Sequence, residues 1–163
     1  MARRIPFRNF LASSPLMAGV DQESMLAATR VIRPRPFRQG EALFTPGDGG
    51  REMFLVLAGT VRIELPCDEL RAPMALLGPG ELAGVTTFFD ARTPRYCWAV
   101  GAERGLAAMI PPVVYVEAAR LGHPVARNIE QLALQTLLKR DRLSQRRYAE
   151  LSGAAPPPRW QRA

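Results

Sequence analysis

The first two thirds of the chain alternate apolar and polar side chains over short stretches that end in glycine or proline. In residues 60–65, Val61, Ile63 and Leu65 alternate with polar neighbours, which is the two-residue period of a strand with one solvated face. Because the strands are short, evenly spaced and not separated by helical patterns, they predict an antiparallel β-roll. The expected strands are residues 31–37, 53–58, 60–65, 71–77, 96–100 and 106–110.

Helical patterns flank this region. Asp21 is expected to be the N-cap of a short helix that ends near Arg30, because its carboxylate can accept a hydrogen bond from the first free amides. Pro111 and Pro112 open a later helix, since proline is tolerated in a first turn. The predicted fold class is α+β, mainly β: a jelly-roll-like antiparallel β-roll (a double-stranded β-helix) with short N-terminal helices and a long C-terminal helix.

The long C-terminal helix is predicted from Val125 to about Leu151. At ~1.5 Å per residue it is roughly 40 Å long, which is more than a β-roll of this size can cover. Its apolar stripe therefore needs a second cover, and a second copy of the chain would supply one. The alternative is a monomer whose helix closes over its own pocket. The side chains assigned to a homodimer contact are Ile129, Leu132, Leu137 and Leu138.

The far end of this helix is basic. Residues 139–142 and 146–147 contain one lysine and four arginines, and cations near a helix C-terminus interact favourably with the helix dipole. We interpret them as a solvated face.

Length and composition favour one compact domain. The chain has 163 residues, of which 47% are hydrophobic, enough to build a core. We assign residues 1–9 to a basic tail, residues 10–151 to the domain and residues 152–163 to a disordered tail rich in proline and arginine. The net charge of +7 attracts polyanions non-specifically but identifies no partner.

The sequence also argues against several classes of protein. No run approaches the ~20 apolar residues of a membrane span, and Arg3 and Arg4 are not followed by the apolar core of an export signal, so we expect a cytoplasmic protein. One histidine, His123, and two cysteines on separate predicted strands provide neither a metal site nor a catalytic triad. We expect His123 to cap a helix or lie on the surface, and we predict a non-enzyme without a cofactor.

The residues that suggest a function lie between Gly80 and Val100. An apolar strand runs into Gly78–Gly80, a short segment follows that is neither alternating nor clearly helical, and Thr93-Pro94-Arg95 leads into the next strand. Glycine amides that face an arginine make an anion cradle, because the amides donate fixed hydrogen bonds and the guanidinium adds a planar, bidentate charge. The segment therefore predicts a phosphate-sized site. Its two carboxylates, Glu81 and Asp90, are expected to have turn and cap roles.

This segment resembles the phosphate-binding cassette of cyclic nucleotide-binding domains, which occur in catabolite-activator-type regulators and in regulatory subunits of cAMP-dependent kinase. Gly84 matches the glycine and Arg95 the arginine that hold the cyclic phosphate in that family, and Pro94 matches the proline that often precedes the arginine. Val85 lies where the family has a glutamate that holds the ribose 2′-hydroxyl, and Tyr96 lies where a small residue is usual. The resemblance covers roughly residues 10–151.

The resemblance implies a ligand site formed by residues of the cassette: Gly84, Val85, Arg95, Tyr96 and Cys97. Since Val85 cannot accept a hydrogen bond, the site forfeits about 1.5 to 3 kcal/mol, or roughly tenfold to hundredfold in affinity. With few residues after Leu151, the winged helix-turn-helix of the transcription factors is not expected, nor is sequence-specific DNA binding.

Two functions remain open. The first is a stand-alone sensor that binds cAMP or cGMP, or another phosphate ligand, and transmits binding through the C-terminal helices. The second is a degenerate domain that binds no nucleotide and acts as a dimeric adaptor for a protein partner. Non-specific nucleic-acid binding by the basic ends is a third, weaker reading, which should collapse as salt rises.

Overall fold

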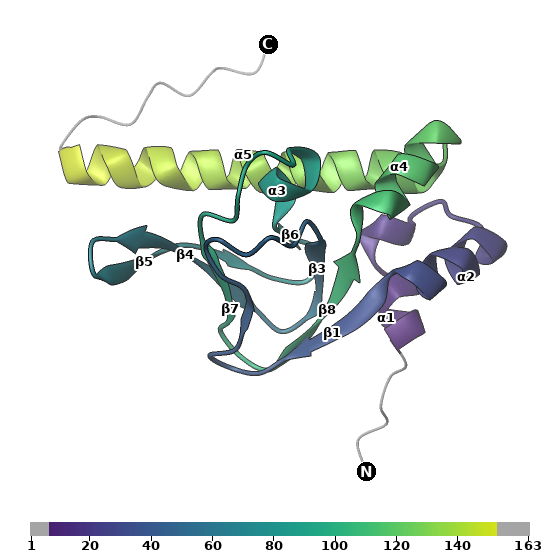
Figure 1. The fold of residues 1–163 in the computed structure, drawn as a ribbon, viewed down its shortest axis with the longest axis horizontal. Helices are drawn as coiled ribbons and strands as arrows, with labels where there is room; N and C mark the ends of the chain where they lie inside the picture. The colour runs from purple at the N-terminus through teal and green to yellow at the C-terminus, as the bar shows by residue number, and fades with distance from the viewer. Residues whose placement is uncertain (1–6, 153–163) are drawn as a thin grey trace.

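Two four-stranded antiparallel sheets form the centre of the part of the chain that the computed structural model describes, residues 7–152 (Figure 1). Their strand orders are β1-β8-β3-β6 and β2-β7-β4-β5. The predicted β-roll is thus confirmed. The strands are β1 (Arg33–Phe37), β2 (Ala42–Phe44), β3 (Met53–Ala58), β4 (Val61–Cys67), β5 (Leu70–Leu77), β6 (Leu82–Ala83), β7 (Trp98–Gly101) and β8 (Gly105–Ile110).

Two strands, β2 and β6, were not predicted, and β1, β4 and β7 begin one or two residues later than expected. β2 and β6 have three and two residues, too few to show an alternating pattern. β7 begins at Trp98 rather than at Tyr96. β1 pairs with β8 alone and lies at the edge of its sheet, as its two prolines require, because proline cannot donate to a central ladder.

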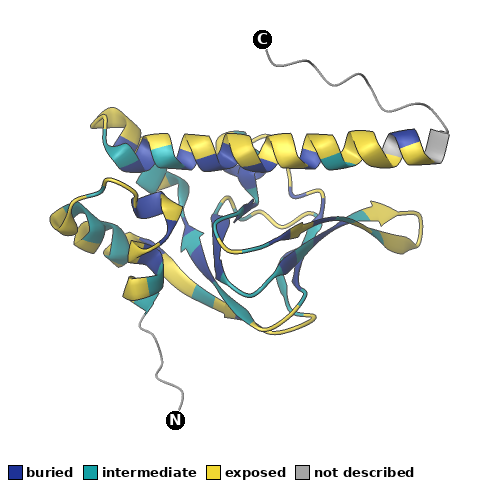
Figure 2. Ribbon diagram, turned by 180° about the vertical axis from the view of Figure 1, so that it is seen from behind, coloured by how far each residue is buried: buried dark blue, intermediate teal, exposed yellow. Residues whose placement is uncertain are grey.

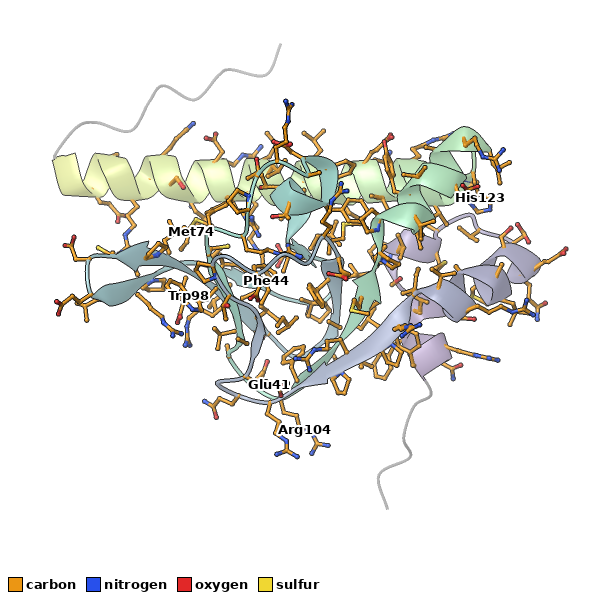
Figure 3. The ribbon with its side chains drawn as sticks, in the orientation of Figure 1. Glu41, Phe44, Met74, Trp98, Arg104 and His123 are labelled. Carbon is orange, nitrogen blue, oxygen red and sulfur yellow. The ribbon has the colours of Figure 1, made fainter. Side chains whose placement is uncertain are left out.

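Strand β3 separates the two apolar clusters of the core. Its residues Met53 and Leu55 point toward the helices, whereas Phe54 and Val56 point between the sheets. Because both faces are covered, β3 is a continuous apolar run without the alternation of β4. In Figure 3, Phe44 lies in the interior of the roll while Arg104 extends outward from its base.

Short helices close the roll on the side of the first sheet. Asp21 accepts a hydrogen bond from the Ser24 amide at 2.9 Å and caps α2 as predicted. His123 has the predicted capping role, because its Nδ1 accepts from the Val125 amide at 3.3 Å where α4 gives way to α5 (Figure 3). The helices are α1 (Phe7–Ala12), η1 (Pro15–Met17), α2 (Gln22–Val31), α3 (Val85–Phe89), α4 (Pro112–Arg120) and α5 (Pro124–Ser152).

The assigned tails differ from the structure at their inner ends. α1 begins at Phe7, so residues 7–9 are helical and do not belong to the basic tail. Ser152 is the last residue of α5. The remaining tail residues, 1–6 and 153–163, lie outside the described part of the chain.

Helix α5 runs along one side of the roll and continues past it above the β4–β5 hairpin (Figure 1). Ile129 and Leu132, assigned from the sequence to a dimer contact, are buried in the chain's own core. They are not available to a second copy, which corrects that assignment. Leu137 and Leu138 are 43% and 46% exposed, and Leu134 is 58% exposed. Figure 2 shows that exposed positions recur along α5 between buried ones.

Candidate functional site

Gly84 forms the sharp turn between β6 and α3. Its φ of 85° is in the left-handed region, where a side chain costs roughly 1 to 2 kcal/mol. A Cβ at this position would overlap Nη1 of Arg95 and would lie 3.2 Å from the carbonyl oxygen of Glu52. Glycine is therefore required here both by the backbone conformation and by the close approach of Arg95.

Arg95 is the charged group at the centre of the cassette. It is only 3% exposed, yet its two described partners are backbone carbonyls: Nη1 donates to Gly84 at 3.2 Å and Nη2 donates to Glu52. Its guanidinium carbon lies 4.2 Å from the centre of the Phe44 ring, within cation–π range. No carboxylate of the described residues makes an ion pair with it.

The charge of Arg95 is costly to bury. Desolvation lowers the pKa of the Arg95 guanidinium below its ordinary value, and the more distant charges of Glu52 and Asp48 offset part of this effect. Arginine is so strongly basic that the side chain stays charged at neutral pH. The fold thus holds a cation that is paired with dipoles rather than with an anion.

Asp90 shapes the loop that delivers Arg95. Its carboxylate accepts hydrogen bonds from the Arg92 amide at 3.0 Å and from the Thr93 hydroxyl at 2.6 Å. These bonds, the one from Thr93 first, lower the pKa of Asp90. Both carboxylates of the segment have the predicted turn roles, since Glu81 accepts from the Gly78 amide at 2.7 Å.

All five ligand residues assigned from the sequence line one small cavity of about 10 Å³, which has room for about one water molecule. Val85 is buried and also packs in the core, whereas Tyr96 is 41% exposed. Burial raises the pKa of the Cys97 thiol, although the charges of Arg140 and Arg95 oppose this shift. The cavity is lined by Gly84, Val85, Arg95, Tyr96, Cys97, Phe44, Thr86, Thr87 and Arg140.

Four lining residues were not assigned from the sequence, and Arg140 is the charged one among them. It comes from α5, is only 8% exposed and shares the cavity with Arg95. Its charge led to its assignment to a solvated face, but Leu132 and Thr136 precede it by eight and four residues and are both buried. Positions four residues apart lie on one face of a helix, so this spacing could have predicted that Arg140 faces the roll.

The strand that enters the cassette also holds α5. The backbone amide of Leu82 donates to the Thr136 hydroxyl at 3.4 Å, and Lys139 Nζ lies 2.5 Å from a carboxylate oxygen of Glu81. Further along, Arg147 donates to the Pro73 carbonyl at 2.9 Å. Gly84 is therefore only two and three residues away from Leu82 and Glu81, which contact α5.

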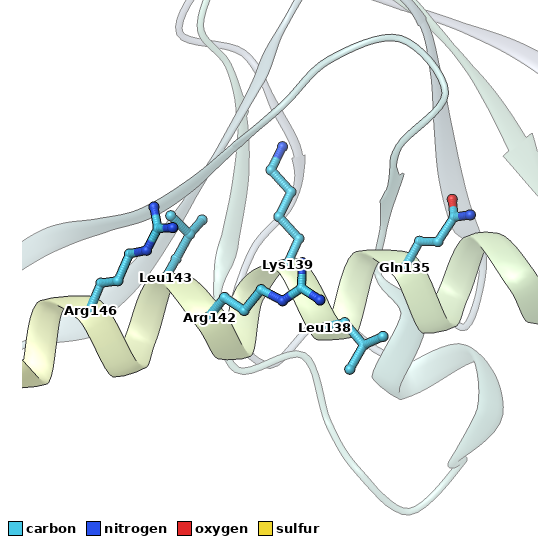
Figure 4. Close-up of a pocket in the computed structure, with 6 residues that line it drawn as sticks. All are labelled: Gln135, Leu138, Lys139, Arg142, Leu143 and Arg146. Carbon is cyan, nitrogen blue, oxygen red and sulfur yellow. The ribbon is translucent and has the colours of Figure 1, made fainter. Parts of the chain in front are cut away.

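A larger hollow, of about 450 Å³, lies beside the far half of α5. Its six lining residues all come from this one helix (Figure 4): Gln135, Leu138, Lys139, Arg142, Leu143 and Arg146. Polar groups from different elements do not converge on it, in contrast to the cavity at the cassette. Within residues 7–152, no three potential metal ligands lie together, and no helix combines the length and the hydropathy that crossing a membrane requires.

The class of protein follows from these features: a β-roll whose glycine turn and buried arginine form a cassette beneath a C-terminal helix. The family model of the cyclic nucleotide-binding domain matches residues 34–117. This chain therefore belongs to the cyclic nucleotide-binding domain family.

Curated relatives match over part of their length. The cyclic AMP receptor protein of Thermus thermophilus is 35% identical over 81 residues, which are 49% of this chain and 38% of that protein. A CRP-like cAMP-activated global transcriptional regulator of Mycobacterium tuberculosis is 26% identical over 81 residues, 49% of this chain and 36% of the relative. The match thus spans well under half of either relative.

Solved structures agree with the fold. The catabolite activator protein of Thermus thermophilus superposes with a TM-score of 0.62 at 30% identity, covering 85% of this chain and 63% of the other. The c-di-GMP responsive regulator CLP of Xanthomonas campestris gives 0.70 at 21% identity, covering 81% and 65%. The cAMP-bound regulatory domain of Toxoplasma gondii PKA gives 0.56 at 15% identity, covering 68% and 42%. The last two support the fold alone.

We predict that Gly84→Ala destabilises the protein more than Gly40→Ala. Both glycines have a positive φ, but a Cβ at Gly40 meets nothing within 4 Å, so Gly40→Ala should cost only the strain of about 1 to 2 kcal/mol. Gly84→Ala must also displace Arg95, which adds about 1 to 3 kcal/mol of overpacking. Denaturant unfolding measures the free energy of unfolding of both variants. Equal decreases would show that the position of Arg95 does not require a glycine at residue 84.

Proposed function

We propose that this domain is a sensor that binds a cyclic mononucleotide, cAMP or cGMP, with the phosphate against Gly84 and Arg95. The observation that carries the proposal is the burial of Arg95 as a cation whose described partners are neutral carbonyls. A phosphate would supply the anion that the fold itself does not place there, through charge-assisted hydrogen bonds. The membership of the chain in the cyclic nucleotide-binding family supports the same assignment.

Two local features affect how a nucleotide could bind: the side chain at position 85 and the size of the cavity. Val85 offers no acceptor to a ribose hydroxyl, so the affinity should be roughly tenfold to hundredfold lower than with a carboxylate at this position. The cavity of about 10 Å³ is too small for a nucleotide, so a ligand must displace a lining side chain. Tyr96, the half-exposed one, is the group we expect to move outward.

The response would pass from the cassette to α5. Residues Glu81 and Leu82 contact α5 through Lys139 and Thr136, so a shift of the cassette changes the contacts that hold the helix. A ligand can switch the domain only if it binds one position of α5 more tightly than another. We propose a regulatory role without catalysis in the cytoplasm, as expected from the sequence.

Calorimetric titration with cAMP and cGMP tests this function. We expect micromolar binding of at least one of them, and a loss of roughly tenfold to hundredfold in Arg95→Gln, since a charged hydrogen bond to phosphate is removed. Arg92→Gln is the matched control, because Arg92 lies in the same loop but its side chain is 96% exposed. No heat at millimolar ligand, or equal effects of the two substitutions, would contradict the proposal.

A second candidate function is a dimeric adaptor that binds no nucleotide. It is favoured by the exposed leucines of α5, Leu134, Leu137 and Leu138, which form a stripe because they are three and four residues apart. With Ile129 and Leu132 buried in the chain's own core, these three leucines are the large apolar side chains that the described part of α5 exposes to a second copy or a protein partner.

Sedimentation of the double substitution Leu137→Ser with Leu138→Ser tests the adaptor. If the stripe forms a dimer, the double variant should be a folded monomer at concentrations where the unsubstituted protein is a dimer. Leu121→Ser, at an exposed leucine after α4, should leave the dimer intact. A dimer that persists in the double variant, or an unsubstituted protein that is monomeric, would argue against this surface.

A further inference from the structure

Three buried side-chain nitrogens of the described residues have no hydrogen-bond partner, and all three belong to two arginines. They are Nε of Arg95 and both Nε and Nη2 of Arg140. Buried polar groups are normally paired, and an unpaired charged donor is especially costly. The two arginines come from a loop and from α5, 45 residues apart, yet they line the same small cavity.

The lining provides no negative charge to balance the two guanidiniums. None of the nine lining residues is an aspartate or glutamate. Cys97 lies beside both arginines, but burial raises the pKa of its thiol and keeps it neutral at neutral pH. Two like charges repel more strongly in a poorly solvated interior than in water. The cavity therefore concentrates two positive charges and several free donors at one place.

We propose that the ligand of this cassette carries two negative charges where it meets the protein, one facing Arg95 and one facing Arg140. This inference rests on the proposed function, since it takes the cassette to be a phosphate site, and it refines the ligand class. A cyclic mononucleotide has a single phosphodiester charge and would leave one guanidinium uncompensated. A terminal phosphate, with a charge of about −1.5 to −2 at neutral pH, matches both, as do two linked phosphodiesters.

Because Arg140 lies on α5, binding of a charged ligand to it would affect the position of this helix. Arg140 lies one turn after Thr136, which contacts Leu82, and two turns before Arg147, which contacts Pro73. Without an anion, the burial of Arg140 with two unpaired nitrogens opposes the docking of this part of α5. A ligand with a charge for Arg140 would offset that cost and stabilise the docked helix, so binding and helix position would be linked.

The test compares ligands that differ in charge. We would titrate the protein with cAMP, with adenosine 5′-monophosphate and with a cyclic dinucleotide, which separates a terminal phosphate from a pair of phosphodiesters. At least one two-charge ligand should bind tenfold or more tightly than cAMP. Arg140→Met should weaken that ligand by roughly tenfold to hundredfold and change cAMP affinity little. Arg142→Met, at an exposed position of the same helix, is the matched control.

A ligand-free measurement guards against misfolding of the variant. In a buffer without phosphate or sulfate, Arg140→Met should unfold at the same temperature as the unsubstituted protein or a few degrees higher, because replacing a buried unpaired charge by an apolar group relieves a cost. Arg140→Gln, which keeps donors without the charge, should give the same loss of two-charge ligands. A clear fall of the unfolding temperature in both variants would mean that Arg140 is compensated in the native state, and the inference would be wrong.

The outcomes separate this inference from the proposed function. If cAMP binds as well as either two-charge ligand and depends on Arg95 but not on Arg140, the inference fails and the proposed function stands. If Arg140→Met weakens all three ligands equally, or affects only the choice of base, Arg140 does not read charge and the inference also fails. If no ligand binds, or binding is indifferent to Arg95→Gln, both fail.

Discussion

The buried guanidinium of Arg95 is the interaction on which the cassette depends. It links the turn at Gly84 to the carbonyl that precedes β3 and to the ring of Phe44 on β2. Because β2 belongs to one sheet and β3 and β6 to the other, the Arg95 side chain connects the two sheets. The requirement for glycine at position 84 follows in part from the same contact, because a side chain there would occupy the space of Arg95.

Helix α5 completes the site because its inner face carries both core and cassette contacts. Its first half packs Ile129 and Leu132 into the core, and its middle brings Thr136 and Arg140 to the cassette. Under the proposed function, the apolar first half would stay in place while the charged middle of α5 responds to a ligand. The same helix exposes Leu134, Leu137 and Leu138 to solvent.

Much of the fold was predictable from the sequence, and the reasons are local. The alternation in β4 and the prolines of β1 are properties of a few neighbouring residues, and so is the cap at Asp21. The cassette was predictable because Gly84 and Arg95 each have a distinctive steric or electrostatic role. β6 was not, because two residues carry no period. The burial of Ile129 and Leu132 and the inward position of Arg140 were missed, since they depend on which face of α5 meets the roll, and that is decided by packing between distant segments.

Nuclear magnetic resonance of the arginine Nε–H groups tests the central claim most directly, because each group reports its own hydrogen bonding. The signals of Arg95 and Arg140 can be assigned by their loss in Arg95→Lys and Arg140→Lys, with the exposed Arg92 as an internal reference. The account predicts that cAMP shifts the Arg95 signal, that adenosine 5′-monophosphate or a cyclic dinucleotide, whichever binds, shifts both buried signals, and that Arg92 is unaffected. An Arg95 signal that stays in place at millimolar concentrations of both ligands, or that moves only as much as that of Arg92, would contradict it.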